Sequence, residues 1–120
     1  MAQHNEIGVK GELVAKKFLE DNGYTVCETN WRSRHLEIDL VAKKENTLII
    51  IEVKTRKSNY FGEPEEWVSR QKQKNLMAAT NAYIEKNELD MEVRFDIISV
   101  IYSGEGTKIN HIQDAFSAVS

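Results

Sequence analysis

The chain has 120 residues, of which 41% are hydrophobic and 29% are charged, and its formal net charge is −3. This length supports one domain with its own core, residues 1–120, and the mixed composition excludes a disordered or collagen-like chain. The negative charge argues against an indiscriminate electrostatic grip on nucleic acid, although basic residues gather in RSRH, KTRK and RQKQK. The single cysteine excludes a disulfide framework and a thiolate-rich metal site.

No apolar run approaches the ~20 residues of a membrane span. The N-terminal sequence MAQHNEIGVKGE lacks the basic-then-apolar plan of a secretory signal. We therefore expect a cytoplasmic protein that does not engage a membrane.

The first predicted element is a helix over residues 8–22. Its apolar residues recur at helical spacing, and Asn22 followed by Gly23 supplies a left-handed C-terminal stop. Three strands are expected next, over residues 24–31, 36–43 and 46–54. The last two are joined across the polar stretch KKEN, which predicts a β-hairpin. The third strand is apolar at consecutive positions, so we expect it at the centre of a sheet that is covered on both faces.

A second helix is predicted from Pro64, which suits a first helical position, to about Lys86. Residues 93–102 are then predicted as a fourth strand and residues 109–112 as a weak fifth. The stripe of the second helix that we expect to be buried consists of Val68, Leu76, Ala79 and Tyr83, with Lys72 on the same stripe. This element order predicts a mixed sheet covered by helices, at the border of the α/β and α+β classes.

Two charged residues interrupt the most hydrophobic stretch of the chain, where Glu52 and Lys54 follow the apolar run LIII. A charge in such a run costs several kcal/mol unless another group pairs with it. If the hairpin pairs residues whose numbers sum to an odd value, Asp39 faces Glu52 across the ladder. Lys54 points to the same face as Glu52, because side chains alternate along a strand.

Two adjacent carboxylates repel each other, and one lysine offsets that repulsion only in part. A hard divalent cation, Mg²⁺ or Mn²⁺, relieves it and leaves coordination positions for water and a phosphate. Lysine beside such a site can orient a water molecule or stabilise charge on phosphorus. Asp39, Glu52 and Lys54 therefore indicate a metal-dependent phosphodiesterase site. The alternative is a structural cluster of salt bridges at the end of a sheet.

The segments EIDLVA and LIIIEVKTR resemble the core of the PD-(D/E)XK nucleases, with Asp39, Glu52 and Lys54 in the motif positions. Nearly the whole chain resembles the YraN family of small, endonuclease-like bacterial proteins, which are related to archaeal Holliday junction resolvases. This resemblance rests on six segments that follow one another in the order found in the family: GVKGELVAKKFLEDNGY, NWR, EIDLVA, IIEVKTR, FGEPEEWVSRQKQKNL and RFDIISV. The resemblance implies a restriction-endonuclease-like αβββαβ core, a mixed sheet of four or five strands flanked by helices.

The resemblance also implies that a glutamate of the first helix reaches the metal, and Glu12 in GELVAKKFL occupies that position. Glu12, Asp39 and Glu52 would then hold Mg²⁺ or Mn²⁺, and Lys54 would assist the attacking water. One departure is Leu36, which stands where the family usually has glycine before EID. Leucine there is expected to alter substrate access or the start of the strand, and it leaves the acidic positions intact.

Four basic residues are candidates for phosphate contacts. Arg56 lies two positions beyond Lys54 on the same face, Lys72 lies on the inner side of the second helix, and Arg32 and Arg34 precede the second strand. The alternative for each is a solvated surface residue or, for Lys72, a side chain whose stem covers the core.

Three hypotheses follow from the residues. The first is an endonuclease that cuts DNA, branched or single-stranded, with possible homodimerisation by analogy with resolvases. The second is a module that binds nucleic acid or a protein partner in DNA processing without cutting. The third is a structural salt-bridge cluster, which predicts that Glu52→Ala loses stability. The metal-site hypothesis predicts instead that apo Glu52→Ala is as stable as the wild type or more so.

Overall fold

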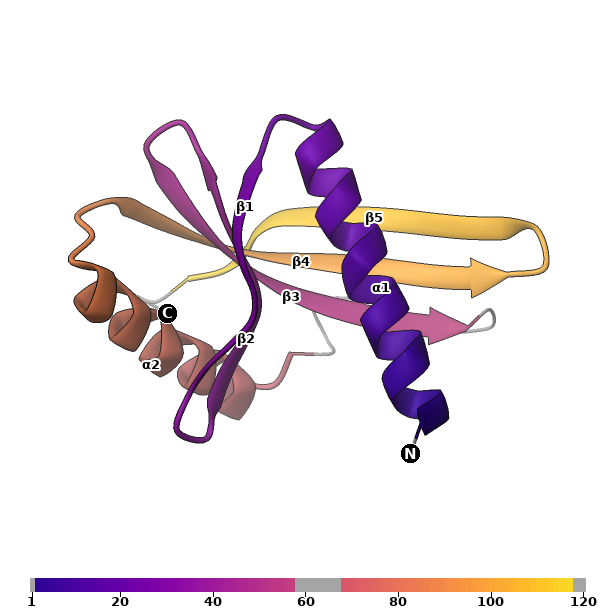
Figure 1. The fold of residues 1–120 in the computed structure, drawn as a ribbon, viewed down its shortest axis with the longest axis horizontal. Coiled ribbons are helices and arrows are strands. Elements are labelled where there is room, and N and C mark those ends of the chain that lie inside the picture. Colours follow the sequence, from indigo (N-terminus) through magenta and orange to yellow (C-terminus); the bar gives the residue numbers. More distant parts are fainter. Residues whose placement is uncertain (1, 58–67, 118–120) are drawn as a thin grey trace.

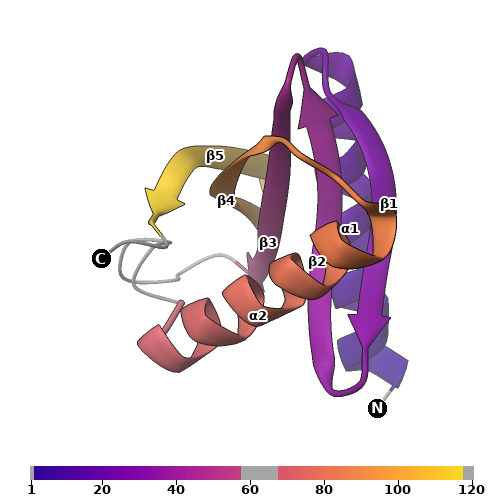
Figure 2. The same cartoon turned by 90° about the vertical axis from the view of Figure 1, so that its left-hand side faces the viewer.

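Five strands form one mixed sheet with a helix on each face in a computed structural model, which describes residues 2–57 and 68–117 (Figures 1 and 2). This α/β architecture is compatible with a restriction-endonuclease-like core. Neither helix in the described part of the chain is long and apolar enough to cross a membrane. The elements are α1 (Ala2–Asp21), β1 (Thr25–Ser33), β2 (Leu36–Lys44), β3 (Thr47–Lys57), α2 (Arg70–Asn87), β4 (Glu92–Ser103) and β5 (Gly106–Phe116).

The sheet has the strand order β1-β2-β3-β4-β5, so β3 is central, as its unbroken apolar run predicted. Only the β3–β4 pair is parallel, and the other three pairs are antiparallel. Leu48 and Ile50 pack in the core under α2, whereas Ile49 and Ile51 pack in the core under α1. Figure 2 shows the two helices on opposite sides of the sheet. Burial on both faces explains why apolar residues do not alternate with polar ones in β3.

Helix α1 crosses β3 and β4 on one face of the sheet (Figure 1). It buries Ala15 and Leu19 completely. Gly11 sits so close to Thr55 of β3 that an added Cβ atom would collide with the threonine hydroxyl. The helix ends as predicted, since Gly23 adopts a left-handed φ of 88°. It begins at Ala2, six residues earlier than expected.

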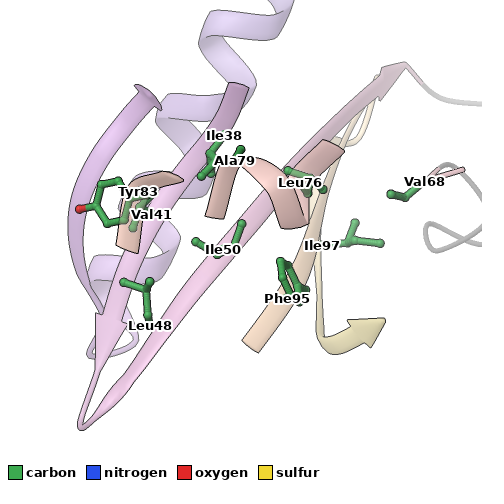
Figure 3. Packing of buried hydrophobic residues seen from close by; sticks show 10 residues of the cluster. All are labelled: Ile38, Val41, Leu48, Ile50, Val68, Leu76, Ala79, Tyr83, Phe95 and Ile97. Atoms are coloured by element: carbon green, nitrogen blue, oxygen red, sulfur yellow. The ribbon is translucent and has the colours of Figure 1, made fainter. Parts of the chain in front are cut away.

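Helix α2 begins at Arg70, later than the sequence predicted. Ser69 is its N-cap, and its hydroxyl accepts a hydrogen bond from the backbone N–H of Lys72 at 3.1 Å. The predicted start at Pro64 lies outside the described residues. Val68 is buried but precedes the helix, so it joins the predicted stripe from a non-helical position. Figure 3 shows this core, in which all four residues of the stripe lie.

Strand β5 is a full strand rather than the weak one expected, and it pairs with β4 from Ser103↔Gly106 to Phe95↔Phe116. A buried carboxylate on β4 also binds side-chain and backbone groups of β5. Asp96 of β4 is fully buried and accepts hydrogen bonds from Arg94 and from the backbone N–H of Asp114. His111 Nε2 lies 2.7 Å from the same carboxylate. Asp96 therefore links Arg94 of its own strand to His111 and the backbone of β5.

Candidate functional site

The site lies where β2 and β3 separate. Their paired residues sum to the predicted odd number, but the ladder ends at Leu40↔Ile51, one step before Asp39 would meet Glu52. Instead, the Asp39 carboxylate accepts a hydrogen bond from the backbone N–H of Val53 at 2.9 Å. Figure 3 shows the two strands diverging from their hairpin toward the level of Ile38. The predicted register is therefore confirmed, while the direct pairing of Asp39 and Glu52 is not formed.

A distortion in β1 lies beside this divergence. Asn30 has a positive φ of 51°, and the β1–β2 ladder passes from Thr29↔Leu40 to Trp31↔Ile38 without an intervening pair. Ile38 packs in the core under α2, whereas Leu40 packs in the core under α1. Two residues two apart in a regular strand would share a face. The side chains of β2 therefore switch from one face of the sheet to the other at Asp39. This places the Asp39 carboxylate between the core under α1 and the core under α2.

Glu52 approaches from the α2 side. Its side chain continues the face of Ile50, and only 4% of the residue is exposed. Glu52 Oε2 lies 3.4 Å from Lys54 Nζ and 3.5 Å from Lys72 Nζ. Lys72 thus reaches the site from α2, as its place on the predicted stripe suggested. Two ammonium groups compensate one buried carboxylate, which is why this charge is tolerated at the end of an apolar strand.

Glu12 approaches from the α1 side. Asn30 hydrogen-bonds the Glu12 carboxylate, and the contact of the preceding Gly11 with Thr55 sets the distance of this part of α1 from the sheet. Burial raises the pKa of Glu12, and the charges of Glu37 and Glu52 raise it further, against the lowering effect of the Asn30 hydrogen bond. The structure thus brings Glu12 within electrostatic range of Glu52 from the opposite face of the sheet.

The pKa of Asp39 is shifted further from its usual value than the pKa of Glu12. Burial and then the charge of Glu52 raise the pKa of Asp39 to about 7 against the lowering effect of the hydrogen bond from Val53, and the charges of Glu12 and Glu37 add smaller upward contributions. Among the described residues, no cationic side chain forms an ion pair with Asp39. The two lysines act on Glu52, so the uncompensated negative charge of the site is concentrated on Asp39.

Glu12, Asp39 and Glu52 supply carboxylate oxygens, the ligand type that Mg²⁺ and Mn²⁺ prefer. Among the side chains that the structure describes, however, no three from His, Cys, Asp or Glu are grouped closely enough to hold an ion in their present positions. The donor types and the raised pKa of Asp39 fit a divalent cation, since a cation would relieve the repulsion that raises it. Binding therefore requires the side chains to close around the ion.

The four predicted phosphate contacts lie in different parts of the structure. Lys72 lies at the site, with 43% of its side chain exposed. Arg56 lies beyond Lys54 on β3 and donates a hydrogen bond to the backbone oxygen of Thr55 at 2.8 Å. Arg32 is on β1, where it pairs with Glu37 at 3.3 Å.

Arg34 occupies the turn between β1 and β2, where it is exposed and has a left-handed φ of 60°. Leu36, which stands at the usual glycine position, opens β2 and pairs with Ser33. The turn that precedes the EID segment thus takes its left-handed residue at Arg34 rather than at position 36.

Two residues of the site were not singled out from the sequence. The role of Asn30 depends on a left-handed φ inside a strand, for which a lone asparagine is a weak signal. Ser99 of β4 is completely buried, and it pairs with Lys54 across the parallel β3–β4 ladder. Its hydroxyl has no hydrogen-bond partner in the described structure. Only the strand register places this serine beside Lys54.

Comparison with known proteins finds one matching family profile, that of the uncharacterised protein family UPF0102, over residues 11–100. The chain is 50% identical to a UPF0102 protein of Christiangramia forsetii over 116 residues, which cover 97% of this chain and 98% of the relative. It is 47% identical to the UPF0102 protein of Bacteroides thetaiotaomicron, over 97% of this chain and 96% of that one. The matched segment contains all the carboxylates of the site.

Proposed function

The chain belongs to the uncharacterised protein family UPF0102, also called YraN, and on that premise we propose that it is a metal-dependent endonuclease that hydrolyses phosphodiester bonds in DNA. Branched or single-stranded DNA is the substrate class that the resemblance to resolvases favours. The observation that carries the proposal is the uncompensated carboxylate of Asp39. It lies within electrostatic range of Glu12 and Glu52, and its pKa is raised to about 7.

A purely structural cluster accounts poorly for this arrangement. The chain places two lysines on Glu52, but it leaves Asp39 buried beside like charges at a cost to folding. Perturbed carboxylates of this kind are concentrated at functional sites, where a ligand supplies the missing charge. A divalent cation is the ligand that suits three carboxylates.

Glu12, Asp39 and Glu52 would hold Mg²⁺ or Mn²⁺. The bound ion would polarise a phosphate oxygen and lower the pKa of a water molecule. The chain's own contributions are positional. The hydrogen bond from Val53 fixes Asp39, the hydrogen bond from Asn30 orients Glu12, and Lys54 and Lys72 place positive charge beside Glu52. Lys54 is 19% exposed at its side chain, so it is available to a phosphate or to the attacking water.

A titration of isotope-labelled protein with Mn²⁺, followed by NMR, tests the proposal without a guess at the substrate. We expect selective paramagnetic broadening around Glu12, Asp39 and Glu52 in the wild type and its loss in Asp39→Asn. The matched control is Glu45→Gln, which removes an equal charge from the turn between β2 and β3. A cleavage screen over branched, single-stranded and duplex DNA follows. Broadening that is equal in the wild type and Asp39→Asn would contradict the metal site.

The second candidate function is a nucleic-acid-binding module that does not cut. It is favoured by the geometry of Glu52, whose carboxylate is already paired with two ammonium groups. It is favoured also by the absence of a close trio of ligands in the described structure. DNA binding that persists unchanged in EDTA, with no product in Mg²⁺ or Mn²⁺, would select this function over the endonuclease.

A further inference from the structure

Two ammonium groups hold Glu52, and they differ in their freedom to move. Glu52 Oε2 lies 3.4 Å from Lys54 Nζ and 3.5 Å from Lys72 Nζ, and the Glu52 side chain is only 5% exposed. The side chain of Lys54 is 19% exposed and extends from the same strand as Glu52, whereas that of Lys72 is 43% exposed and extends from α2. Lys72 can therefore move from Glu52 into solvent more readily than Lys54 can.

The ammonium group of Lys72 competes with any other cation for Glu52. It lies 3.5 Å from a Glu52 oxygen and carries the same sign of charge as an ion that this carboxylate would hold. Like charges beside one carboxylate repel each other, so the contact with Lys72 lowers the affinity of Glu52 for a metal ion. The ion pair between Lys72 and Glu52 must therefore break before the carboxylates of the site can close around an ion.

The start of α2 gives a second and independent indication, because it favours a negative partner. Backbone N–H groups and the helix dipole make this end of a helix positive, so carboxylates are preferred there. The first turn of α2 nevertheless contains Arg70 and Lys72 and no acidic residue. The Ser69 hydroxyl accepts a hydrogen bond from the backbone N–H of Lys72 at 3.1 Å. This cap fixes the backbone of Lys72, so that the side chain alone exchanges one anionic partner for another.

We propose that Lys72 is a placeholder cation, which neutralises Glu52 in the free protein and moves to a substrate phosphate when a divalent cation takes its place. The inference rests on the proposed function and adds to it a coupling between metal binding and nucleic-acid binding. Both ligands require the same ion pair to break, because the metal needs Glu52 and the phosphate needs Lys72. The first ligand to bind breaks the pair, so the second binds more tightly, and this coupling is reciprocal.

Two simpler roles of Lys72 lead to different results. If Lys72 only contacts a phosphate, the loss of its charge leaves the affinity for a metal ion alone unchanged. If Lys72 only keeps Glu52 in place, its loss disturbs that carboxylate and weakens metal binding. The placeholder role predicts that loss of Lys72 strengthens metal binding, because a competing cation is removed from Glu52.

Titration of the full chain with Mn²⁺ in the absence of nucleic acid, followed by NMR broadening, tests the competition at Glu52. Lys72→Gln should bind Mn²⁺ about two- to fivefold more tightly than the wild type, the range that corresponds to one partly exposed ion pair. The matched control is Lys74→Gln, which removes the same charge from an exposed position of α2 and should leave the Mn²⁺ affinity near that of the wild type. Equal affinities in Lys72→Gln and Lys74→Gln, or weaker binding in Lys72→Gln, would overturn the placeholder.

The same titration with single-stranded DNA tests the coupling, if phosphorothioate linkages keep the charge of the DNA and resist cleavage. At equal concentrations of free Mn²⁺, this DNA should tighten Mn²⁺ binding about two- to fivefold more in the wild type than in Lys72→Gln. Equal tightening in both proteins would overturn the exchange at Lys72 and leave the metal site intact. Absence of localised broadening in the wild type and both variants would instead overturn the proposed endonuclease.

Discussion

The carboxylate of Asp39 accepts a hydrogen bond from the backbone N–H of Val53 at 2.9 Å, in place of the next rung of the β2–β3 ladder. The ladder therefore ends where the site begins. Because the carboxylate lies in the gap between the two strands, it is within range of Glu12 on the α1 side and of Glu52 on the α2 side. A fully paired hairpin would have pointed Asp39 to a single face.

Asp39→Asn should stabilise the metal-free protein at alkaline pH. The folded-state pKa of about 7 exceeds the unfolded value of 3.8, so the folded state holds its proton more tightly. Stability from this group is fully present below pH 4 and is lost as the pH rises through 7. Asparagine keeps an acceptor for Val53. We expect a gain on the order of 2 to 4 kcal/mol at pH 8 and almost none at pH 4, measured by urea unfolding.

Asp96→Asn provides the opposite case, because the pKa of Asp96 is lowered whereas that of Asp39 is raised. Burial alone would raise the pKa of Asp96, but hydrogen bonds from His111, Arg94 and the Asp114 backbone lower it. Its contribution to stability is therefore present above the unfolded value and is lost as the pH falls through the folded pKa. The substitution should cost about 3 kcal/mol at pH 7, and less at pH 3. An equal loss at both pH values would contradict the role of the charge.

Glu52→Ala should lower the stability of the metal-free protein by about 1 to 2 kcal/mol, as the structural-cluster hypothesis predicts and contrary to what the metal-site hypothesis led us to expect. The reason is that the ammonium groups of Lys54 and Lys72, which lie 3.4 and 3.5 Å from the Glu52 carboxylate, lose their ion-pair partner in the variant. Thermal melts at two salt concentrations should show the loss. A stability change at Glu52 thus no longer separates a metal site from a structural cluster, and Asp39 provides that test.

Gly11→Ala should lower stability by about 1 to 3 kcal/mol and should weaken Mn²⁺ binding, because the new methyl group collides with the Thr55 hydroxyl and displaces α1. The double variant with Thr55→Ala removes that hydroxyl. It should recover part of both losses, as measured by unfolding and by the NMR titration. If Thr55→Ala does not restore either quantity, the close approach of α1 to β3 is not what positions Glu12.

Asn30→Gly should separate positioning from stability. Glycine adopts the φ of 51° without the steric cost that asparagine bears, but it cannot hydrogen-bond Glu12. We expect stability equal to or above that of the wild type, together with Mn²⁺ affinity lowered by about threefold or more. Unchanged metal affinity would show that the hydrogen bond from Asn30 does not orient a ligand.

Much of the fold followed from local pattern. The consecutive apolar residues of β3 predicted a central strand, and Gly23 marked the end of α1, because burial and backbone conformation act over a few residues. The second helix was expected to start at Pro64, which lies outside the described residues, whereas α2 starts at Arg70 after its N-cap, Ser69. The length of β5 was underestimated because its pairing with β4 stabilises residues of low strand propensity.

The sequence by itself determined which residue types the candidate site contains, because Asp39, Glu52 and Lys54 follow from strand periodicity and a two-stranded register. Only the tertiary structure decided how their charges are distributed. Lys72 arrives from a helix twenty residues beyond Glu52, and Asn30 reaches Glu12 between separate elements. The divergence of β2 from β3 leaves Asp39 without a cation. These contacts depend on how layers pack in space, and no local sequence pattern encodes that packing.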